Sequence, residues 1–372
     1  MPEPGDRIRF ALDGAPAGLF RIVRIEEGAA RRVEAVAHAS APGREPAAIE
    51  VSPRESGANA LYRPDLVLLD LPALTGTDEL GWARAAARMR PWRPLLLSSS
   101  TGSEGFRPRG RLDAPARIGR LAEMLLPGRR EGVIDRVGKI RVSLGFGGLE
   151  SVTMAALLDG ANAAAILAGN GVFEIVQFLD AEEFAPGIWE LANLLRGQAG
   201  TDDAMRAGAA AGARFVMLDE GAVRPIGLEA AEAGLMRNFV ADAVGAAPDG
   251  AIAPVAFAGG MRARTPLSPA HVRARREAGG IRVTWIRRGR LDADTWTAPE
   301  IGFDETVERY RVEVMAGVAV KRTVEVDAPE WLYPAAAELA DFGAPLTQIS
   351  LRVAQAGRHV PWGVARPATV SL

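Results

Sequence analysis

The chain has 372 residues, with 44 Lys and Arg against 46 Asp and Glu, and a formal net charge of −2 at pH 7. Such a balance gives no overall field that would draw the protein to nucleic acid or to an anionic membrane. The sequence has no cysteine, which excludes disulfides, thiol nucleophiles and cysteine metal sites. No apolar signal region opens it and no apolar run reaches the roughly 18 residues of a membrane span. We expect a soluble chain of two or three domains without a signal peptide, since a domain takes about 150 residues.

Residues 7–39 predict three antiparallel strands at the start of the chain. Apolar and polar side chains alternate in "RIRFAL" and recur in "GLFRIVRI" and "RRVEAVAHA", and short turn segments separate the three runs. This pattern is typical of hairpins with one face in solvent. Three strands rarely close a stable core alone. We therefore expect residues 1–72 to be part of a larger β-domain.

Residues 73–262 predict a second β-rich domain. Runs such as "PLLLSSS", "GKIRVSL" and "VFEIVQFLD" are short, apolar and bounded by turn-forming residues. Just before them, "PDLVLLDLPAL" is apolar on both faces, which indicates a buried strand or a crossing between domains. The secondary structure of two segments stays undecided. Residues 79–89, "ELGWARAAARM", favour a helix by propensity but also fit a strand, and residues 202–213, "DDAMRAGAAAGA", fit a short helix or a loop.

The last module, residues 265–372, predicts a β-sandwich. Gly, Ala and Pro dominate residues 245–271, which indicates a linker into this module. Trp285 falls in its second predicted strand and Tyr310 in its third, and Ile349, Leu351 and Val353 alternate in a late strand. This order is typical of a fibronectin-type sandwich, and the lack of cysteine excludes a disulfide-linked antibody domain. The predicted fold class is mainly β: several antiparallel β-domains ending in a fibronectin type III-like sandwich.

The sequence offers no catalytic constellation. The glycine-rich residues 144–151, "LGFGGLES", lack the Lys-Ser/Thr pair of a phosphate loop and favour a tight turn. Adjacent carboxylates at Glu182 and Glu183, with Asp180 nearby, favour a solvated turn over a glycosidase pair. The remaining candidates are scattered or lack a partner: His38, His271, His359 and the serines Ser98, Ser99 and Ser100. We expect a protein that is not an enzyme and has no catalytic, cofactor-binding or metal-binding residues.

One loop is a candidate surface for a partner. In residues 285–296, "WIRRGRLDADTW", three arginines lie between two tryptophans, and Arg with aromatics can stack on bases or sugars. Asp292 and Asp294 follow the arginines, so internal pairing of Arg with Asp is the favoured interpretation of their charge. The candidate partner-binding residues are Arg287, Arg288, Arg290 and Trp296.

Several strings resemble a known family. "GGLESVTMAALLDGANAAAI", "WELANLLRGQAGTD", "ARFVMLDEG" and "TWIRRGRLDADTW" are similar to the C-terminal part of the large tail-tip hub (megatron) protein of gene transfer agents and related siphophages. The resemblance runs from about Asp65 to the end. It implies that residues 1–72 are the closing strands of a partial hub β-domain, that residues 73–262 are a β-rich tail-tip domain, and that "ELGWARAAARM" and "RIGRLAEMLL" are strands. No glycosidase activity follows, because the barrel that would carry it is not in this sequence.

For function, the resemblance implies a structural virion component at the tail tip of an extracellular phage-like particle. Such a baseplate hub takes part in tail assembly, host attachment and DNA delivery. The expected partners are other tail or baseplate proteins, two further copies in a homotrimer, and a host receptor or polysaccharide, without specific nucleic-acid binding and without a cofactor. The alternative is a carbohydrate-binding or carbohydrate-active surface protein, in which Trp82, Trp189, Trp296 or Trp362 stacks on sugars.

Overall fold

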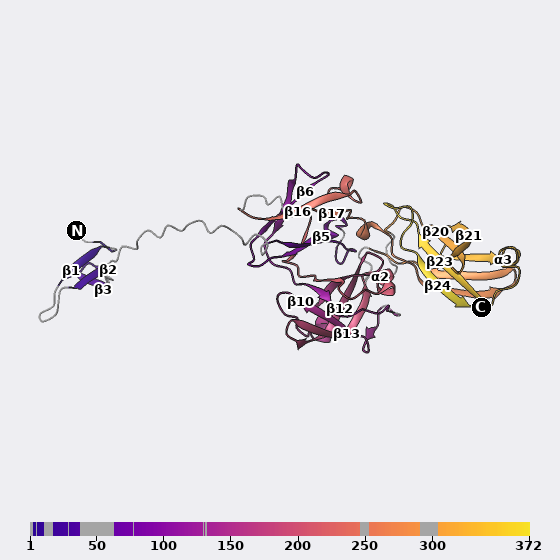
Figure 1. The fold of residues 1–372 in the computed structure, drawn as a ribbon, viewed down its shortest axis with the longest axis horizontal. Coiled ribbons are helices and arrows are strands. Elements are labelled where there is room, and N and C mark those ends of the chain that lie inside the picture. The colour runs from indigo at the N-terminus through magenta and orange to yellow at the C-terminus, as the bar shows by residue number, and fades with distance from the viewer. Residues whose placement is uncertain are drawn as a thin grey trace. The chain divides into compact units, whose positions relative to one another are not determined.

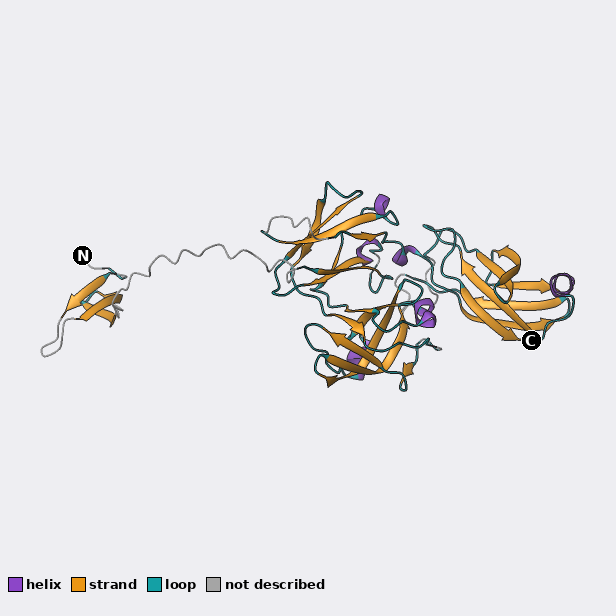
Figure 2. Cartoon of the chain, viewed as in Figure 1, coloured by secondary structure: helices purple, strands orange, loops and turns teal. Residues whose placement is uncertain are grey.

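The computed structural model describes residues 3–4, 6–10, 18–28, 30–37, 63–76, 78–128, 130, 132–245, 253–290 and 304–372. The chain divides into two compact units, Met1–Gly57 and Ala58–Leu372. Antiparallel sheets are the main regular structure of the described residues in both units, as Figure 2 shows. The predicted mainly β fold class is therefore confirmed. No helix among the described residues is long and apolar enough to cross a membrane.

The first unit is a three-stranded antiparallel sheet. Its strands are β1 (Arg7–Phe10), β2 (Gly18–Glu26) and β3 (Arg32–Ala37), in the order in which the sequence predicted them. Ile22 is 2% exposed, but Val23 and Val36 are 51% and 61% exposed. A sheet of this size with so little buried surface is marginal alone. That residues 1–72 are part of a larger β-domain stays a prediction.

The second unit begins with three stacked layers (Figure 1). The central layer is the sheet β15–β5–β4. On one face of β4, Val67 and Leu69 pack against a barrel that is described below. On the other face, Leu68 packs against the sheet β17–β16–β6–β7. The two sheets consist of β4 (Asp65–Asp70), β5 (Ala83–Arg88), β6 (Leu95–Ser100), β7 (Arg107–Leu112), β15 (Val223–Pro225), β16 (Arg237–Ala243) and β17 (Val255–Phe257). The expectation that "PDLVLLDLPAL" holds a buried strand is confirmed.

Residues 79–89 resolve the open choice between helix and strand. A single 3₁₀ turn, η2 (Leu80–Trp82), leads directly into β5, so the strand interpretation is confirmed. The alanines of β5 are fully buried, with Ala85 and Ala87 on one face and Ala86 on the other. Small side chains suit a strand that is packed between two layers, and this packing overrides their helix propensity.

The third layer is a closed barrel of six strands. β10, β8, β14, β11, β12 and β13 pair in that order, and β10 pairs again with β13 through Val142 and Trp189. The barrel elements are β8 (Ile118–Leu121), β9 (Ile134–Asp135), β10 (Ile140–Leu144), α1 (Met154–Leu158), β11 (Ala163–Leu167), β12 (Phe173–Ala185), β13 (Ile188–Gln198), α2 (Asp202–Ala207) and β14 (Arg214–Met217). Closure removes exposed strand edges, and Phe178 and Phe215 lie fully buried in its core. "RIGRLAEMLL" forms β8 in its first half, and "DDAMRAGAAAGA" begins with the short helix α2.

The predicted linker is wrong in part. Val255 and Phe257 belong to β17, which pairs with β16, and the Phe257 ring lies 6.1 Å from that of Phe239 in an edge contact. The surrounding Gly, Ala and Pro hide this short alternation in the sequence. Two 3₁₀ turns flank the region, η3 (Ala230–Glu232) and η4 (Arg262–Arg264).

The last module is a two-sheet β-sandwich. One sheet has the order β18–β19–β22 and the other β21–β20–β23–β24, and both contribute to one core. Trp285 and Tyr310 meet there at 5.2 Å between ring centroids, with a T-shaped geometry. The elements are β18 (Ala270–Glu277), β19 (Gly280–Ile286), β20 (Tyr310–Ala316), β21 (Ala319–Val326), β22 (Glu330–Pro334), α3 (Ala335–Phe342), β23 (Gln348–Gln355) and β24 (Arg366–Ser371). The fibronectin type III assignment stays an interpretation of this sandwich.

Domain boundaries differ in position from those expected. β4 pairs with β5 along its whole length, from Asp65 with Arg88 to Asp70 with Ala83. Residues 65–70 thus share a sheet with residues that the sequence assigned to the next domain. The division at Gly57 places them in the second unit.

Candidate functional site at the junction with the sandwich

Three carboxylates fix the connection between the layered part and the sandwich, and we call Asp70, Glu79 and Asp202 the junction carboxylates. Asp70, at the end of β4, accepts backbone N–H bonds from Gly260 at 2.9 Å, Met261 at 3.3 Å and Arg262 at 3.1 Å. Burial raises the pKa of its carboxyl, against the lowering effect of these three bonds. Asp70 therefore anchors the chain just before it enters the sandwich.

Asp202 is the most enclosed of the three. It stands at the start of α2, is 0% exposed, and accepts a bond from the Ser268 hydroxyl at 2.9 Å. Two arginines of the sandwich module reach it, Arg288 at 2.9 Å and Arg366 at 3.0 Å, beside Arg206 of its own helix at 2.6 Å. Burial alone would raise the pKa of this carboxyl, but the charges of Arg206 and Arg288 hold it below its ordinary value. Asp202 stays ionised and holds the sandwich against the barrel.

Glu79 forms a second contact of the same kind, directly before η2. Its carboxylate pairs with Arg290, with Arg264 at 3.5 Å, with Arg358 at 3.4 Å and with His359 at 3.3 Å. Burial alone would raise the pKa of Glu79, but the hydrogen bond and charge of Arg290 hold it below its ordinary value. This site thus joins residue 79 to three later segments of the chain.

Arg290 is the central cation of the Glu79 site. Its side chain is 3% exposed, and its Nε donates to Glu305 at 2.7 Å in addition to the contact with Glu79. Its Nη1 also donates to the carbonyl oxygen of Ala263 at 2.8 Å. A planar guanidinium suits this task because its five N–H groups can serve several acceptors at once.

The structure places three of the four predicted partner-binding residues. Arg288 and Arg290 make the contacts with Asp202 and Glu79, and Arg287 lies 3.9 Å from Glu308. Trp296 lies outside the described residues, as do Asp292 and Asp294. Internal pairing does occur: Arg288 pairs with Asp202, 86 residues away, and Arg290 pairs with Glu79, 211 residues away, and with Glu305, 15 residues away. Partner binding by this loop stays a prediction.

Sequence reasoning missed the junction carboxylates. Asp70, Glu79 and Asp202 belong to no motif, and the aspartates next to two of them, Asp78 and Asp203, give no sign of a shared site. Their role depends on partners that only the tertiary fold brings close. The one usable signal was the arginine density of "WIRRGR", which predicted charge pairing without identifying the partners.

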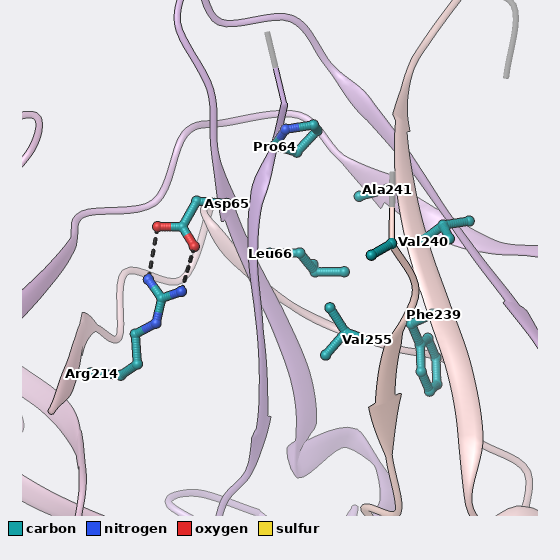
Figure 3. A pocket seen from close by; sticks show the side chains of 9 residues that line it. Pro64, Asp65, Leu66, Arg214, Phe239, Val240, Ala241 and Val255 are labelled. Atoms are coloured by element: carbon teal, nitrogen blue, oxygen red, sulfur yellow. Dashed lines mark hydrogen bonds and ion pairs between the residues drawn. The ribbon is translucent and has the colours of Figure 1, made fainter. Parts of the chain in front are cut away.

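A cavity of about 220 Å³ lies between β4 and β16 (Figure 3). Asp65 and Arg214 form a two-pronged ion pair at one side, and Leu66, Phe239 and Val255 give an apolar wall. Asp65 also pairs with Arg88 at 3.1 Å. The ionic groups already have partners, and the volume is below the roughly 300 Å³ at which small-molecule sites begin. The cavity fits one apolar side chain better than a cofactor.

Several other candidates of the sequence have structural contacts, and His38 lies outside the described residues. Glu183 accepts the Gly187 N–H at 2.8 Å and closes the β12–β13 turn, and Asp180 accepts from the Asn193 amide. Ser99 accepts a bond from Arg109 at 2.8 Å. Gly147, in the glycine-rich segment, has φ of 76°, as a turn requires. Among the described residues no three His, Asp or Glu side chains gather as a metal site would need.

The described tryptophans that were candidates for sugar stacking are largely engaged. Trp82 is 8% exposed and carries Arg84 over its ring at 4.2 Å. Trp189 packs against the barrel core, and Trp362 lies under Arg311 at 5.0 Å. A ring covered by a guanidinium has one face less for a sugar. Carbohydrate binding stays a prediction.

Fold and junction together define a mainly β protein in which a barrel and a terminal sandwich are joined by buried ion pairs. A family model described as Rcc01698-like, C-terminal, matches residues 116–216. This range runs from just before β8 into β14 and so covers all six strands of the closed barrel. No curated protein matches the chain in sequence.

Proposed function

We propose that this chain is a structural, non-enzymatic component of the tail of a gene transfer agent or a siphophage-like particle. In this proposal it belongs to the tail-tip hub of the baseplate. The observation that carries the proposal is the match of the barrel to the Rcc01698-like C-terminal family, because Rcc01698 is a Rhodobacter gene transfer agent protein. A family match over one domain supports a role only by analogy. The rest of the argument must come from the site.

The junction supports a mechanical role. Domains that share one chain usually move relative to each other unless the interface between them is large and well packed. Here Asp202 and Glu79 receive charge-assisted bonds from the sandwich module, and such bonds are short and directional. A sandwich held in one orientation suits a tail component that must present a surface or pass on a force.

The proposed partners follow from this role. We propose that the chain assembles as a homotrimer around the tail axis, contacts other baseplate proteins and faces a host receptor or surface polysaccharide. The loop that carries Trp296 is the proposed contact with a partner. Its neighbours Arg288 and Arg290 would fix the base of that loop from inside, because both are occupied by junction carboxylates.

Localisation in purified particles tests the proposal. An antibody against residues 265–372 should label the tail tip in electron micrographs, and the chain should co-purify with tails in a constant ratio to the tail-tube protein. An antibody against a capsid protein serves as the control and should label the opposite end. A chain that is absent from particles and purifies from cells as a monomer would remove the proposal.

A further inference from the structure

An open groove lies where the sandwich meets the segment between β8 and β9. Its volume is about 410 Å³. β18 contributes His271 and Val272, the β8–β9 segment contributes Arg130 and Val133, and residues 366–370 of β24 form its floor. At about 3.4 Å per residue, five residues of strand extend for about 17 Å. This length is enough to align a short extended peptide.

β24 offers an unpaired edge to this groove. It ends its sheet, and β18 ends the other sheet of the sandwich, with no partner strand beyond either of them among the residues that the structure describes. The Leu372 N–H bonds to the Thr347 carbonyl, so in the register of β23 and β24 the even-numbered residues of β24 bond to β23. The backbone N–H and C=O groups of Pro367, Thr369 and Ser371 therefore point away from β23, toward the outer edge of the sheet.

Pro367 makes this edge selective. Proline has no N–H, so of the three outward positions only Thr369 and Ser371 can donate. On β18 the pairing with β19 shifts register between Ala270 and Arg273. Bulges and prolines are the means by which natural edges avoid indiscriminate pairing. The edge is thus restricted to a short stretch and to one register.

The rim of the groove is cationic. Its lining includes Arg130 and Arg366 and no carboxylate, and Arg366 already bonds to Asp202. The exposed Arg273 continues this surface along β18, and Arg275 beside it pairs with Glu277 at 2.5 Å. An acidic chain is therefore the complement of this surface.

We propose that this groove binds an extended acidic segment of a partner polypeptide, which adds as a strand along β24. Main-chain bonds to Thr369 and Ser371 would provide affinity, the apolar floor would take alternate aliphatic side chains, and the cationic rim would take the carboxylates between them. The inference goes beyond the proposed function, because it stands whatever particle the chain belongs to.

Peptide binding to the full chain tests the proposal. The probe is a fluorescent nine-residue peptide of alternating Val and Asp, and the matched peptide has Lys in place of Asp. Fluorescence anisotropy should show binding of the acidic peptide alone. Hydrogen exchange measured by mass spectrometry should show new protection in residues 366–372, where Thr369 and Ser371 lose exposure, and none at the β21 edge.

Two variants separate strand addition from charge alone. T369P removes an outward N–H without breaking a bond to β23 and should weaken the acidic peptide about three- to tenfold, the value of one backbone hydrogen bond. T369V keeps the N–H, loses the hydroxyl contact with Ser350, and should bind as the wild type does. Arg130 lies outside the sandwich, so R130E should leave the folding of β24 unchanged. This variant should bind the Lys peptide more tightly than the acidic one.

Two results would overturn the proposal. If the acidic peptide binds T369P as tightly as T369V and protects no amide in residues 366–372, the site attracts polyanions by charge and adds no strand. If neither peptide binds the wild type at millimolar concentration, the groove is no peptide site.

Discussion

The Asp202 and Glu79 sites have the same task and differ in composition. Asp202 is 0% exposed and meets arginines and a serine, which keep their charge state at any pH that the fold survives. Glu79 has a side chain 13% exposed and meets a histidine as well as arginines. The Asp202 site should therefore hold the sandwich at any pH at which the protein is folded. The Glu79 site should respond to pH in the range where histidine titrates.

The environment of His359 explains this difference. Arg264 donates to its Nδ1 at 2.8 Å and Arg358 approaches its Nε2 at 3.2 Å, so arginine N–H groups face both ring nitrogens. Burial lowers the pKa of His359 and the charge of Arg264 lowers it further, although Glu79 opposes them. Protonation of this ring in the folded state is therefore costly.

The largest effect is expected at Asp202. D202A leaves Arg288 and Arg366 without their buried acceptor, and loss of one partner of a buried ion pair costs about 3–5 kcal/mol. Denaturant unfolding of the full chain should show this loss in the free energy of unfolding. D113A, which removes an exposed pair with Arg111, should change it by less than about 0.5 kcal/mol. A loss below about 1 kcal/mol in D202A would show that the site does not fasten the sandwich.

A smaller loss is expected at Glu79. E79Q keeps the shape of the side chain but removes the charge that Arg290 and its neighbours share. Hydrogen bonds to charged groups contribute about 1.5–3 kcal/mol, and Glu305 still holds Arg290 at 2.7 Å. We expect a loss of about 2 kcal/mol in the same unfolding measurement. A loss equal to that of D202A would contradict this order of the two sites.

The sandwich could be predicted from sequence because its signal is local. Alternation in β19 places Ile281, Val283 and Trp285 on the core side, and the structure buries all three. β22 and α3 were missed, since "EWLYPAAAELADF" changes from strand to helix at Pro334 with no turn residues between them. Helix propensity could have indicated α3, but not that it follows a strand directly.

The barrel and the junction show where sequence reasoning stops. The strands of the barrel were recognisable, but its closure depends on β10 pairing with β13, more than 40 residues later, and no local pattern indicates such a pair. The junction carboxylates are likewise visible only after folding. Arg290 in the sequence is equally compatible with an exposed partner site and with the 3% exposed side chain that the structure has.

pH dependence separates the two sites further. Because the pKa of His359 in the folded protein lies below its ordinary value of 6.5, the unfolded state binds more protons as pH falls through 6.5. Stability should therefore decline from pH 7 toward pH 5. Glu79 and Asp202 have lowered pKa values, so their contributions are lost only below about pH 4.5 and pH 3.8 respectively. Unfolding curves at several pH values check this order.

Histidine variants test whether His359 causes the decline in stability near pH 6. H359N should lose much of it, whereas H271N, at an exposed residue whose φ of 51° asparagine tolerates, should keep it. The same slope in H359N and the wild type would assign the decline to another group.

The smallest effect is expected at Arg358, on the outer side of the Glu79 site. Its side chain is 48% exposed, its contact with Glu79 is 3.4 Å long, and exposed ion pairs contribute about 0–1 kcal/mol. R358A should therefore change the free energy of unfolding by about 0.5 kcal/mol or less at pH 7. It also removes the N–H that faces His359 Nε2, so protonation of the ring becomes easier and the decline between pH 7 and pH 5 should be shallower. A steeper decline in R358A would show that Arg358 stabilises the protonated ring, and the origin of the pH response at Glu79 would then have to be sought elsewhere.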